Sequence, residues 1–377
     1  MTPEIVQKIP ILDLAPQTER LWDELTAAVQ AVMRSGHFIM GPQVRAFERE
    51  VAEHLGVSHA LAVNSGTDAL VIALRAMEIG PGDEVIVPPF TFFATAEAVS
   101  MVGATPVFVD IEPDTFNIDV AALEAAITPR TRAVIPVHLF GQSADMGPIL
   151  TIARRADIKV LEDAAQSFGA DYQGRQTGTM GDAGALSFFP SKNLGAFGDA
   201  GMIVTNDDAL AAEAAMLRVH GSRRKYYNET IGYNSRLDEI QAAILRVKLP
   251  HVAEGNRSRV AAAAAYGASL SDLPGVTAPT ARAYGTHVYH QYTVRIAGGR
   301  RDRVKSVLDR MGVGTMVYYP VPVHRLPVYA STSPSLPVAE QAAEEVISLP
   351  IGPDLDEATV AHVVACLREA LSEAGPA

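Results

Sequence analysis

The sequence has little cysteine and no long apolar run. Cys366 is the single cysteine among 377 residues, which excludes an internal disulfide framework and a cysteine-based zinc cluster and fits a reducing compartment. Nowhere do 18 apolar residues follow one another, and the N-terminal stretch, broken by Pro3 and Pro10, has no apolar region of the kind found in signal peptides. We therefore expect a soluble, cytoplasmic protein that does not bind a membrane.

Positive charge and the common nucleotide and metal motifs are also scarce. The 31 Lys and Arg residues against 43 Asp and Glu residues give a net charge of −12, which argues against a nucleic acid partner. The sequence contains no GxGxxG, GxxxxGK[ST], HExxH or GxSxG motif. The pair His287 and His290 has no acidic residue at ligand spacing, so we expect no metal site and interpret these histidines as polar groups near a strand.

The composition and periodicity predict an α/β fold with two domains. Hydrophobic residues make up 48% and charged residues 20%, as in ordinary globular proteins, and the chain exceeds the length at which a single core stops growing. Between residues 57 and 205, short β-branched runs alternate with Ala- and Leu-rich segments of helical period, which predicts a mostly parallel seven-stranded sheet flanked by helices. The expected strands are His59–Val63, Glu84–Val87, Thr105–Val109, Arg132–Val137, Lys159–Leu161, Ala185–Phe189 and Met202–Thr205, and the expected helices include Asp68–Met77 and Ala94–Met101.

A change of domain is expected near Pro250. Residues 1–250, with the N-terminal segment, are interpreted as the large domain, and residues 251–377 as a small α+β domain. Helices are expected at Arg236–Val247 and Val252–Leu270 on either side of this boundary. The small domain is expected to contain a strand at Val288–Ile296, helices at Arg301–Met311 and Asp356–Glu373, and a proline-rich loop at Pro320–Pro327.

One of only six lysines lies in an unusual sequence context. Lys192 follows the apolar strand Ala185–Phe189 and precedes the glycine-rich segment 193–201, so it lies at the carboxyl end of a strand, where open α/β sheets bind ligands. A lysine partly removed from water has a lowered pKa and becomes nucleophilic, as Schiff-base chemistry requires. The alternative is an ordinary surface lysine whose ammonium reaches solvent.

Two further segments end at the same predicted edge of the sheet. Residues 63–70 join a strand to a helix through small, hydroxyl-bearing residues, which suit phosphate binding by backbone N–H groups but are also ordinary helix caps. Asp163 follows an apolar strand, where its carboxylate can pair with a cationic ring nitrogen or simply cap the next helix. A strand-end lysine, a strand-end carboxylate and a phosphate-binding helix start are together the parts that a pyridoxal phosphate (PLP) enzyme requires.

Five segments in register along the chain carry a more specific resemblance. The strings SGTDAL, VPPFTFFATAEAV, EDAAQSFGA, SFFPSKNLGAFGDAG and GYNSRLDEIQAAIL resemble the motifs of the DegT/StrS aminotransferases, which are PLP-dependent sugar-nucleotide transaminases of fold type I. The similarity runs from about Ile11 to Ile351. It implies PLP as the cofactor and a homodimer with shared active sites. Because some relatives with histidine in place of the lysine dehydrate sugars, the retained Lys192 favours transamination.

The resemblance assigns roles to the residues around the cofactor ring. It implies that Lys192 binds the cofactor covalently and then moves a proton between the cofactor and the substrate carbon. Asp163 matches the carboxylate that keeps the pyridine nitrogen protonated, and Gln166 matches the residue that contacts the 3-oxygen of the ring. Phe92 matches the aromatic residue that stacks on the ring, although a core phenylalanine is the alternative.

The resemblance also assigns the residues around the anionic groups. Gly66, Thr67 and Ser187 match the phosphate contacts of the family. Asn234 matches a residue that reaches the phosphate of the neighbouring subunit. Arg236 would then face the anionic part of the substrate, unless it pairs with an acidic residue, Asp238 or Glu239, at the start of the next helix.

The implied reaction is amino transfer from an amino acid, in the family usually glutamate, to a nucleotide-linked keto sugar. The YYPxPxH pattern at residues 318–324 resembles the branch that aminates 3-keto sugars, which implies C3 of a dTDP- or UDP-linked hexose held by Tyr319 and His324. The alternatives are amination of a 4-keto sugar, and a regulatory protein that has kept the fold. A desulfurase is disfavoured because Cys366 belongs to an expected packed helix rather than a mobile loop.

Overall fold

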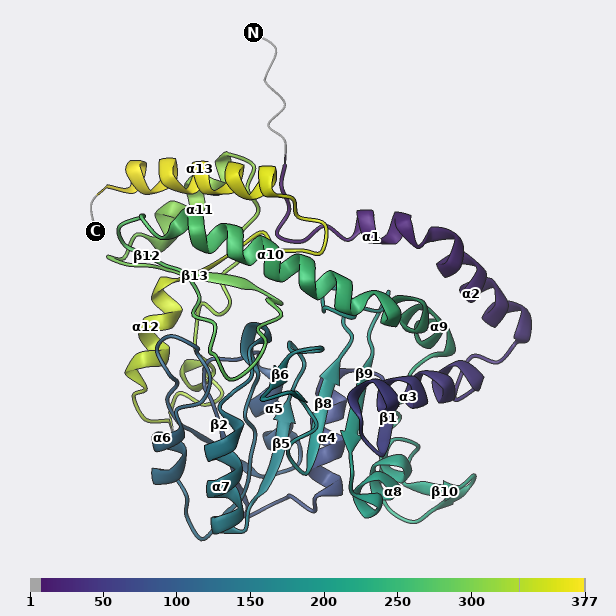
Figure 1. Cartoon of the computed structure of the whole chain (residues 1–377). Coiled ribbons are helices and arrows are strands. Elements are labelled where there is room, and N and C mark those ends of the chain that lie inside the picture. The colour runs from purple at the N-terminus through teal and green to yellow at the C-terminus, as the bar shows by residue number, and fades with distance from the viewer. Residues whose placement is uncertain (1–7, 332, 376–377) are drawn as a thin grey trace.

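A seven-stranded sheet forms the centre of the structure, a computed structural model that describes residues 8–331 and 333–375 (Figure 1). Strand β9 runs antiparallel to both of its neighbours, β1 and β8, and the other neighbouring pairs are parallel, which confirms the predicted mostly parallel sheet. The strands lie in the order β1 (His59–Val63), β9 (Gly201–Thr205), β8 (Ala183–Ser187), β5 (Lys159–Asp163), β4 (Thr131–Val134), β2 (Glu84–Val87) and β3 (Thr105–Phe108).

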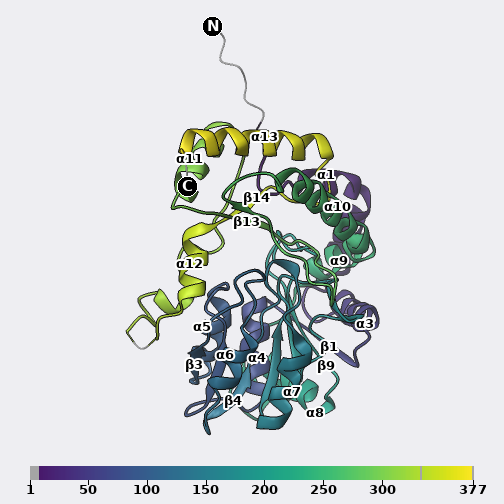
Figure 2. The ribbon, with the colours of Figure 1, turned by 60° about the vertical axis from the view of Figure 1, so that its left-hand side comes forward.

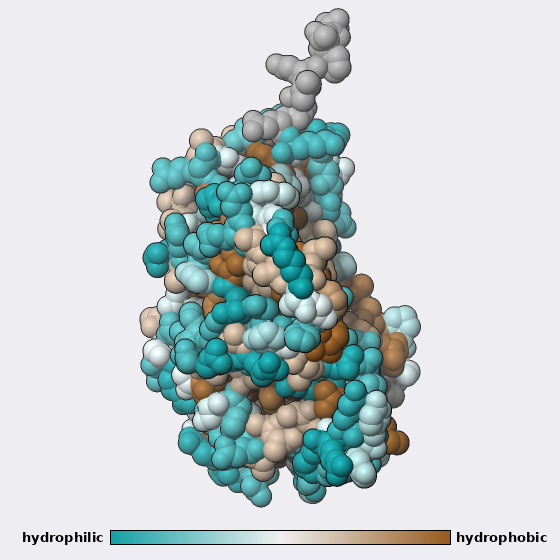
Figure 3. Space-filling model, turned by 90° about the vertical axis from the view of Figure 1, so that its right-hand side faces the viewer, coloured by the Kyte–Doolittle hydropathy of each residue, from teal (hydrophilic) through white to brown (hydrophobic). Residues whose placement is uncertain are grey.

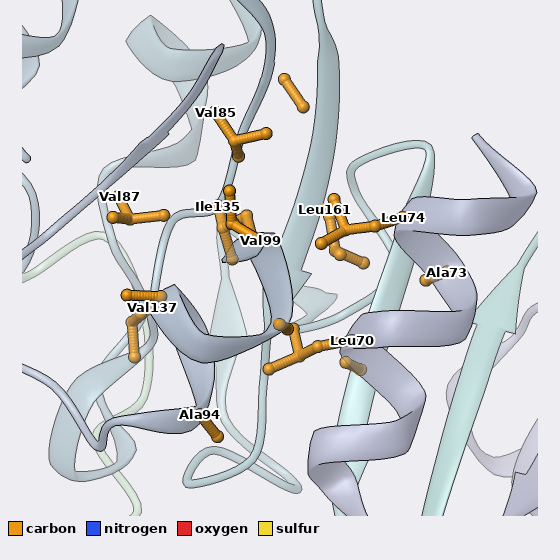
Figure 4. Packing of buried hydrophobic residues seen from close by; sticks show 14 of the residues in the cluster. Leu70, Ala73, Leu74, Val85, Val87, Ala94, Val99, Ile135, Val137 and Leu161 are labelled. Carbon is orange, nitrogen blue, oxygen red and sulfur yellow. The ribbon is translucent and has the colours of Figure 1, made fainter. Parts of the chain in front are cut away.

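Helices cover both faces of this sheet because alternate residues of its strands point to opposite sides. In β2, Val85 and Val87 join one hydrophobic cluster and Ile86 joins another. The first cluster is formed with α4 (Gly66–Ala76), α5 (Ala94–Met101), α8 (Asp208–Leu217) and α12 (Pro337–Glu345), and Figure 4 shows part of it. The opposite face packs against α3 (Pro42–Leu55), α6 (Val120–Ala125), α7 (Met146–Ala156) and α9 (Glu239–Lys248).

The C-terminal part of the chain has a core of its own, above the sheet in Figure 2. Its antiparallel sheet consists of β12 (Val276–Thr277), β13 (Tyr292–Ile296) and β14 (Val346–Leu349), and its helices are α10 (Val252–Leu270), α11 (Arg301–Arg310) and α13 (Glu357–Ala374). The N-terminal segment contacts this part, since Ile9 pairs with Val313. The predicted division near Pro250, which lies in the turn between α9 and α10, stays a prediction.

The remaining elements are short or lie at the periphery. Helices α1 (Ala15–Arg20) and α2 (Trp22–Ser35) lead from the N-terminal segment to α3. Two hairpins, which the sequence analysis did not predict, are β6 (Asp171–Tyr172) with β7 (Arg175–Gln176) and β10 (Ser222–Arg224) with β11 (Tyr227–Asn228). Within the described residues, no helix combines the length and the apolar character needed to cross a membrane.

Several predicted elements have shifted ends, and two shifts affect the site. Strand β8 ends at Ser187 rather than Phe189, because the backbone of Phe188 is bonded instead to Ala196 and Ala200 of the following loop. Strand β5 continues to Asp163 rather than ending at Leu161, so the carboxylate is the last residue of the strand. Helix α9 begins at Glu239 rather than Arg236, β4 ends at Val134 rather than Val137, and β13 begins at Tyr292 rather than Val288.

Candidate active site

A cavity of about 420 Å³ lies at the carboxyl ends of β5 and β8, beside the start of α4. Parallel strands and the helix that follows a strand bring their ends to this edge of the sheet. Eight of the predicted site residues line the cavity, and they are Gly66, Thr67, Phe92, Asp163, Gln166, Ser187, Lys192 and Tyr319. Residues from five separate stretches of the sequence therefore meet at one place.

Asp163 is a buried carboxylate whose two oxygens both accept hydrogen bonds. Thr95 Oγ1 donates to Oδ2 at 2.8 Å, and the backbone N–H of Ala165 donates to Oδ1 at 3.2 Å. Burial raises the pKa of Asp163, whereas these hydrogen bonds and the positive charge of Lys192 act in the opposite direction. A cation bound next to this carboxylate in the cavity would favour its ionised form.

Lys192 lies in the loop after β8, where its side chain faces the cavity. Removal from water lowers the pKa of its ammonium to about 8, and the negative charge of Asp163 only partly opposes this effect. A neutral amine is thereby accessible close to neutral pH, which is the property that a lysine nucleophile needs. The surface-lysine alternative does not agree with this environment.

The start of α4 lies at one end of the cavity. Gly66 and Thr67 contribute the first two N–H groups of the helix, which no carbonyl of the same helix can accept, whereas the Ser65 hydroxyl caps the N–H of Asp68 at 3.1 Å. Gly66 packs closely against β8, since a Cβ atom at Gly66 would lie 2.7 Å from Cβ of Ser187. The glycine therefore lets the helix start approach the Ser187 side chain.

Aromatic and amide groups form the remaining walls. Phe92 is 60% exposed although it is a large apolar residue, so the core alternative does not apply to it. Gln166 accepts a hydrogen bond from the N–H of Phe140 at 2.8 Å and donates one to the hydroxyl of Tyr319 at 3.0 Å, which fixes the orientation of its amide. Tyr319, from the C-terminal part of the chain, is thereby linked to the large sheet.

These groups match the chemical needs of PLP. The cofactor has an aldehyde that reacts with an amine, a ring nitrogen that is cationic when protonated, an apolar ring face and a phosphate. The cavity offers Lys192, Asp163, Phe92 and the start of α4 for these four groups in turn. The donor set therefore fits the cofactor that the sequence predicts.

Three predicted site residues do not line this cavity. Asn234 is exposed and pairs with Val219, and Arg236 is half-buried. Within the part of the chain that the structure describes, Arg236 forms no ion pair with Asp238 or Glu239, because the carboxylate of Glu239 instead accepts the N–H groups of Gln43 and Val44 at the start of α3.

His324 has a different environment from that of a substrate contact. It is fully buried, and its Nε2 lies 3.1 Å from Oε1 of Glu340, in α12. The two residues are 16 positions apart and both lie in the segment that packs against α5 and β3, where His324 also contacts the ring of Phe108. His324 thus packs inside the protein, away from the cavity, and of the two residues predicted to hold the sugar only Tyr319 lines the cavity.

The sequence analysis missed several groups of the site. Thr91 and Thr95 belong to the quoted string VPPFTFFATAEAV, and their spacing of four residues before and inside a helix was the available signal. His290 and Gln291 also line the cavity, although His290 was interpreted as a polar group near a strand and neither was named among the site residues. Burial and the positive charges of Lys192 and Arg259 hold the pKa of His290 well below its ordinary value, so its imidazole is neutral.

Glu162, the neighbour of Asp163 in β5, points to the other face of the sheet. Its fully buried carboxylate accepts four hydrogen bonds, from His138 Nε2 and from the N–H groups of Gly178, Met180 and Gly181. Of these two consecutive acidic residues, Asp163 therefore lies in the site and Glu162 holds the loop before β8. Alternation along a strand separates the two functions.

The chain is similar to known proteins over nearly its whole length. The sequence is 49% identical over 366 residues to a protein of Geobacillus stearothermophilus described as a pleiotropic regulatory protein, which covers 96% of this chain and 98% of the relative. It is 48% identical to a UDP-N-acetyl-3-dehydro-alpha-D-glucosamine 3-aminotransferase of Acidithiobacillus ferrooxidans, over 96% of this chain and 98% of the relative. It is also 48% identical to a dTDP-3-amino-3,4,6-trideoxy-alpha-D-glucose transaminase of Streptomyces venezuelae, over 96% of each chain.

Solved structures show the same similarity. The crystal structure of S. venezuelae DesV superposes with a TM-score of 0.93 at 48% identity and covers 96% of this chain and 98% of that one. NtdA of Bacillus subtilis with bound pyridoxamine phosphate superposes with a TM-score of 0.86 at 32% identity, over 97% of this chain and 87% of that one. The sequence profile of the DegT/DnrJ/EryC1/StrS aminotransferase family matches residues 20–368. The chain therefore belongs to the DegT/DnrJ/EryC1/StrS aminotransferases, which are PLP-dependent enzymes of fold type I.

Proposed function

We propose that the protein transfers an amino group from an amino acid, glutamate in the first place, to C3 of a dTDP- or UDP-linked 3-keto hexose. The observation that carries this proposal is the meeting of Lys192, Asp163 and the start of α4 in one cavity, in a chain that is 48% identical to two nucleotide-sugar 3-aminotransferases. Tyr319, at the wall of the cavity, is the group proposed to hold the sugar.

The residues of the cavity divide the chemistry among them. PLP, when bound, supplies an electron sink for negative charge at the carbon next to the reacting nitrogen. Lys192 holds the cofactor and, once released, gives and takes protons at that carbon, for which a pKa of about 8 is suited. Asp163 stabilises positive charge on the ring nitrogen, and Phe92 shields one face of the ring from water.

The two substrates use the cavity in turn. The donor and the keto sugar would both react with the one cofactor held by Lys192, so the keto acid left after the donor gives up its amine must leave before the keto sugar enters, and we expect ping-pong kinetics. Nucleotide sugars and glutamate are cytoplasmic metabolites, and we place the reaction in the cytoplasm.

We further propose that the active form is a homodimer with shared sites. Large apolar side chains are exposed at or near the cavity, namely Phe92 at 60%, Phe189 at 52% and Phe197 at 45%, and Ile231 just before Asn234 is 87% exposed. Figure 3 shows further hydrophobic residues at the surface of the face that carries α2 and α3. Apolar patches of this kind are typical of interfaces.

A complementation experiment tests the shared site. Lys192→Ala chains and chains with both Asn234→Ala and Arg236→Ala are each expected to be inactive. Mixing the two kinds of chain should restore activity, because a hybrid dimer contains one site in which Lys192 faces an intact Asn234 and Arg236 from the other subunit. A fully active monomer in light scattering would refute the proposal.

The choice of sugar is tested with matched substrates. The enzyme is incubated with glutamate and with 3-keto and 4-keto forms of the same nucleotide sugar, and amino sugars are detected by mass spectrometry. Conversion of the 3-keto compound is expected, and preferential conversion of the 4-keto compound would overturn the C3 assignment. Tyr319→Phe should raise KM for the sugar and leave KM for glutamate unchanged.

One relative is described as a regulatory protein, so a regulatory function is the second candidate. The two functions differ in their need for Lys192. If the protein is an enzyme, the wild type transfers the amine and holds cofactor that borohydride traps covalently, and Lys192→Ala loses both properties. If the protein is purely regulatory, the wild type itself converts neither the 3-keto nor the 4-keto nucleotide sugar.

A further inference from the structure

Two buried threonine hydroxyls connect the cavity to Asp163. Thr95, the second residue of α5, is fully buried, and its Oγ1 donates to Asp163 Oδ2 at 2.8 Å. Thr91, four residues earlier in the segment before the helix, is 2% exposed and lines the cavity, and its Oγ1 lies 3.1 Å from Oγ1 of Thr95. The three groups thus form a continuous chain from the cavity wall to the carboxylate.

The chemistry of the groups fixes the direction of this chain. An ionised carboxylate only accepts hydrogen bonds, and a hydroxyl has one proton to donate. Because the proton of Thr95 points to Asp163, the oxygen of Thr95 must accept the proton of Thr91. Each donor polarises the next, which strengthens the bond to the carboxylate.

We propose that Thr91 and Thr95 are positioning residues that hold the Asp163 carboxylate ionised and oriented toward the ring nitrogen of the cofactor. The proposal rests on the aminotransferase function proposed above. Thr95 is the side chain that donates to Asp163, and the second donor is the backbone N–H of Ala165. The titratable groups that face Asp163 are Lys192 and His138, and neither makes a hydrogen bond to its oxygens within the described residues. Orientation of Oδ2 therefore depends on Thr95.

The hydrogen-bonded relay of Thr91, Thr95 and Asp163 predicts an effect on cofactor binding that depends on the ring nitrogen. Hydrogen bonds to a charged group are roughly twice as strong as neutral ones, and losing one corresponds to about a 10- to 100-fold change in an equilibrium constant. Without Thr95, burial favours the protonated form of Asp163, which cannot stabilise a cationic ring nitrogen. A cofactor analogue with carbon in place of this nitrogen has no such charge, so its binding is independent of the relay.

The test compares two cofactors on the full-length chain. The apoenzymes of the wild type and of Thr95→Val, Thr95→Ser and Thr91→Val are titrated with PLP and with 1-deazapyridoxal phosphate, and each dissociation constant is obtained from absorbance and protein fluorescence. Thr95→Val should raise Kd for PLP about 10- to 100-fold and change Kd for the deaza analogue by less than about 3-fold. Thr95→Ser should restore Kd for PLP, and Thr91→Val should have an intermediate effect.

A control variant separates the relay from general loss of a buried hydroxyl. Thr293→Val removes a comparable buried hydrogen bond, between Thr293 Oγ1 and Ser348 Oγ at 2.8 Å, in the sheet of the C-terminal part. This variant should bind both cofactors like the wild type. Equal weakening of both cofactors by Thr95→Val, or no rescue by Thr95→Ser, would overturn the relay. Failure of the wild type to bind PLP would instead refute the proposed function.

Discussion

Replacement of Glu162 by glutamine tests how much the hydrogen bonds to this buried carboxylate, next to Asp163 in β5, stabilise the fold. Glu162 is fully buried, and its Oε1 accepts the N–H groups of Met180 at 2.5 Å and Gly181 at 2.7 Å. Its Oε2 accepts from His138 Nε2 and from the N–H of Gly178, both at 2.8 Å. An amide can replace only one of the two oxygens as acceptor, so in either orientation its NH2 group faces two donors.

The magnitude follows from these contacts. Hydrogen bonds to a charged group are worth about 1.5–3 kcal/mol each, and two are lost outright, which gives about 3–6 kcal/mol. His138 cannot relieve the conflict by changing its tautomer, because its Nδ1 accepts the N–H of Ala144 at 3.1 Å. We expect Glu162→Gln to lower the free energy of unfolding by at least about 3 kcal/mol, in the range of a broken buried ion pair.

Urea unfolding at one fixed PLP concentration measures this loss, since bound cofactor itself contributes stability. Glu124→Gln is the matched control, because Glu124 forms an exposed ion pair with Arg155 that is worth about 0–1 kcal/mol. A loss below about 1 kcal/mol for Glu162→Gln would contradict the reasoning, as it would place the carboxylate outside a fully bonded, water-free site.

Three further predictions follow from single features. Gly66→Ala places a Cβ atom 2.7 Å from Cβ of Ser187, and the overpacking cost of about 1–3 kcal/mol should raise Kd for PLP by about 5- to 150-fold in a titration of the apoenzyme. The control Gly80→Ala, whose added Cβ has its nearest neighbour at 3.8 Å, should bind PLP like the wild type. Burial lowers the pKa of Lys192 from 10.5 to about 8, so between pH 8 and 10.5 the unfolded apoenzyme binds more protons than the folded apoenzyme. Lys192→Met removes this cost and should therefore stabilise the apoenzyme below pH 8. Its gain in the urea midpoint over the wild type should shrink as the pH rises from 8 to 10.5. A constant advantage would show that Lys192 titrates normally. Ile86→Ala, at a fully buried position of β2, should cost about 2–5 kcal/mol in the same assay, and Val328→Ala, at a 63% exposed position, should cost less than about 0.5 kcal/mol.

Local patterns in the sequence determined the elements of the fold well. Strands β1 and β2 and helices α5 and α10 have the predicted bounds, because short β-branched runs and longer alanine-rich segments were told apart by composition and length. Glycine-rich and aromatic segments were less predictable. The pattern of apolar residues continues from β8 through Phe189, yet the strand ends at Ser187, since hydrogen bonds to a later loop redirect the backbone.

The motifs also determined most of the site. Lys192, Asp163 and the start of α4 were predicted to share one edge of the sheet because a parallel α/β topology brings strand ends together, and they line one cavity. The environment of each group followed only from packing. The sequence places an acid at both 162 and 163, and the side of the strand decides that Asp163 faces the cavity while Glu162 binds the loop of residues 178–181.

Residues that act through long-range contacts were beyond the sequence. The motif around Phe92 contains Thr91 and Thr95, but the hydrogen bond from Thr95 to Asp163 joins positions 68 residues apart and depends on how the fold brings the start of α5 to the end of β5. His324 shares a motif with Tyr319, yet the turn between them directs Tyr319 to Gln166 and His324 to Glu340. The sequence by itself thus determined which chemical groups are present and at which edge they gather, because these depend on local periodicity. Only the tertiary structure decided which of them face the cavity, because burial and hydrogen bonding are set by neighbours that are distant in the chain.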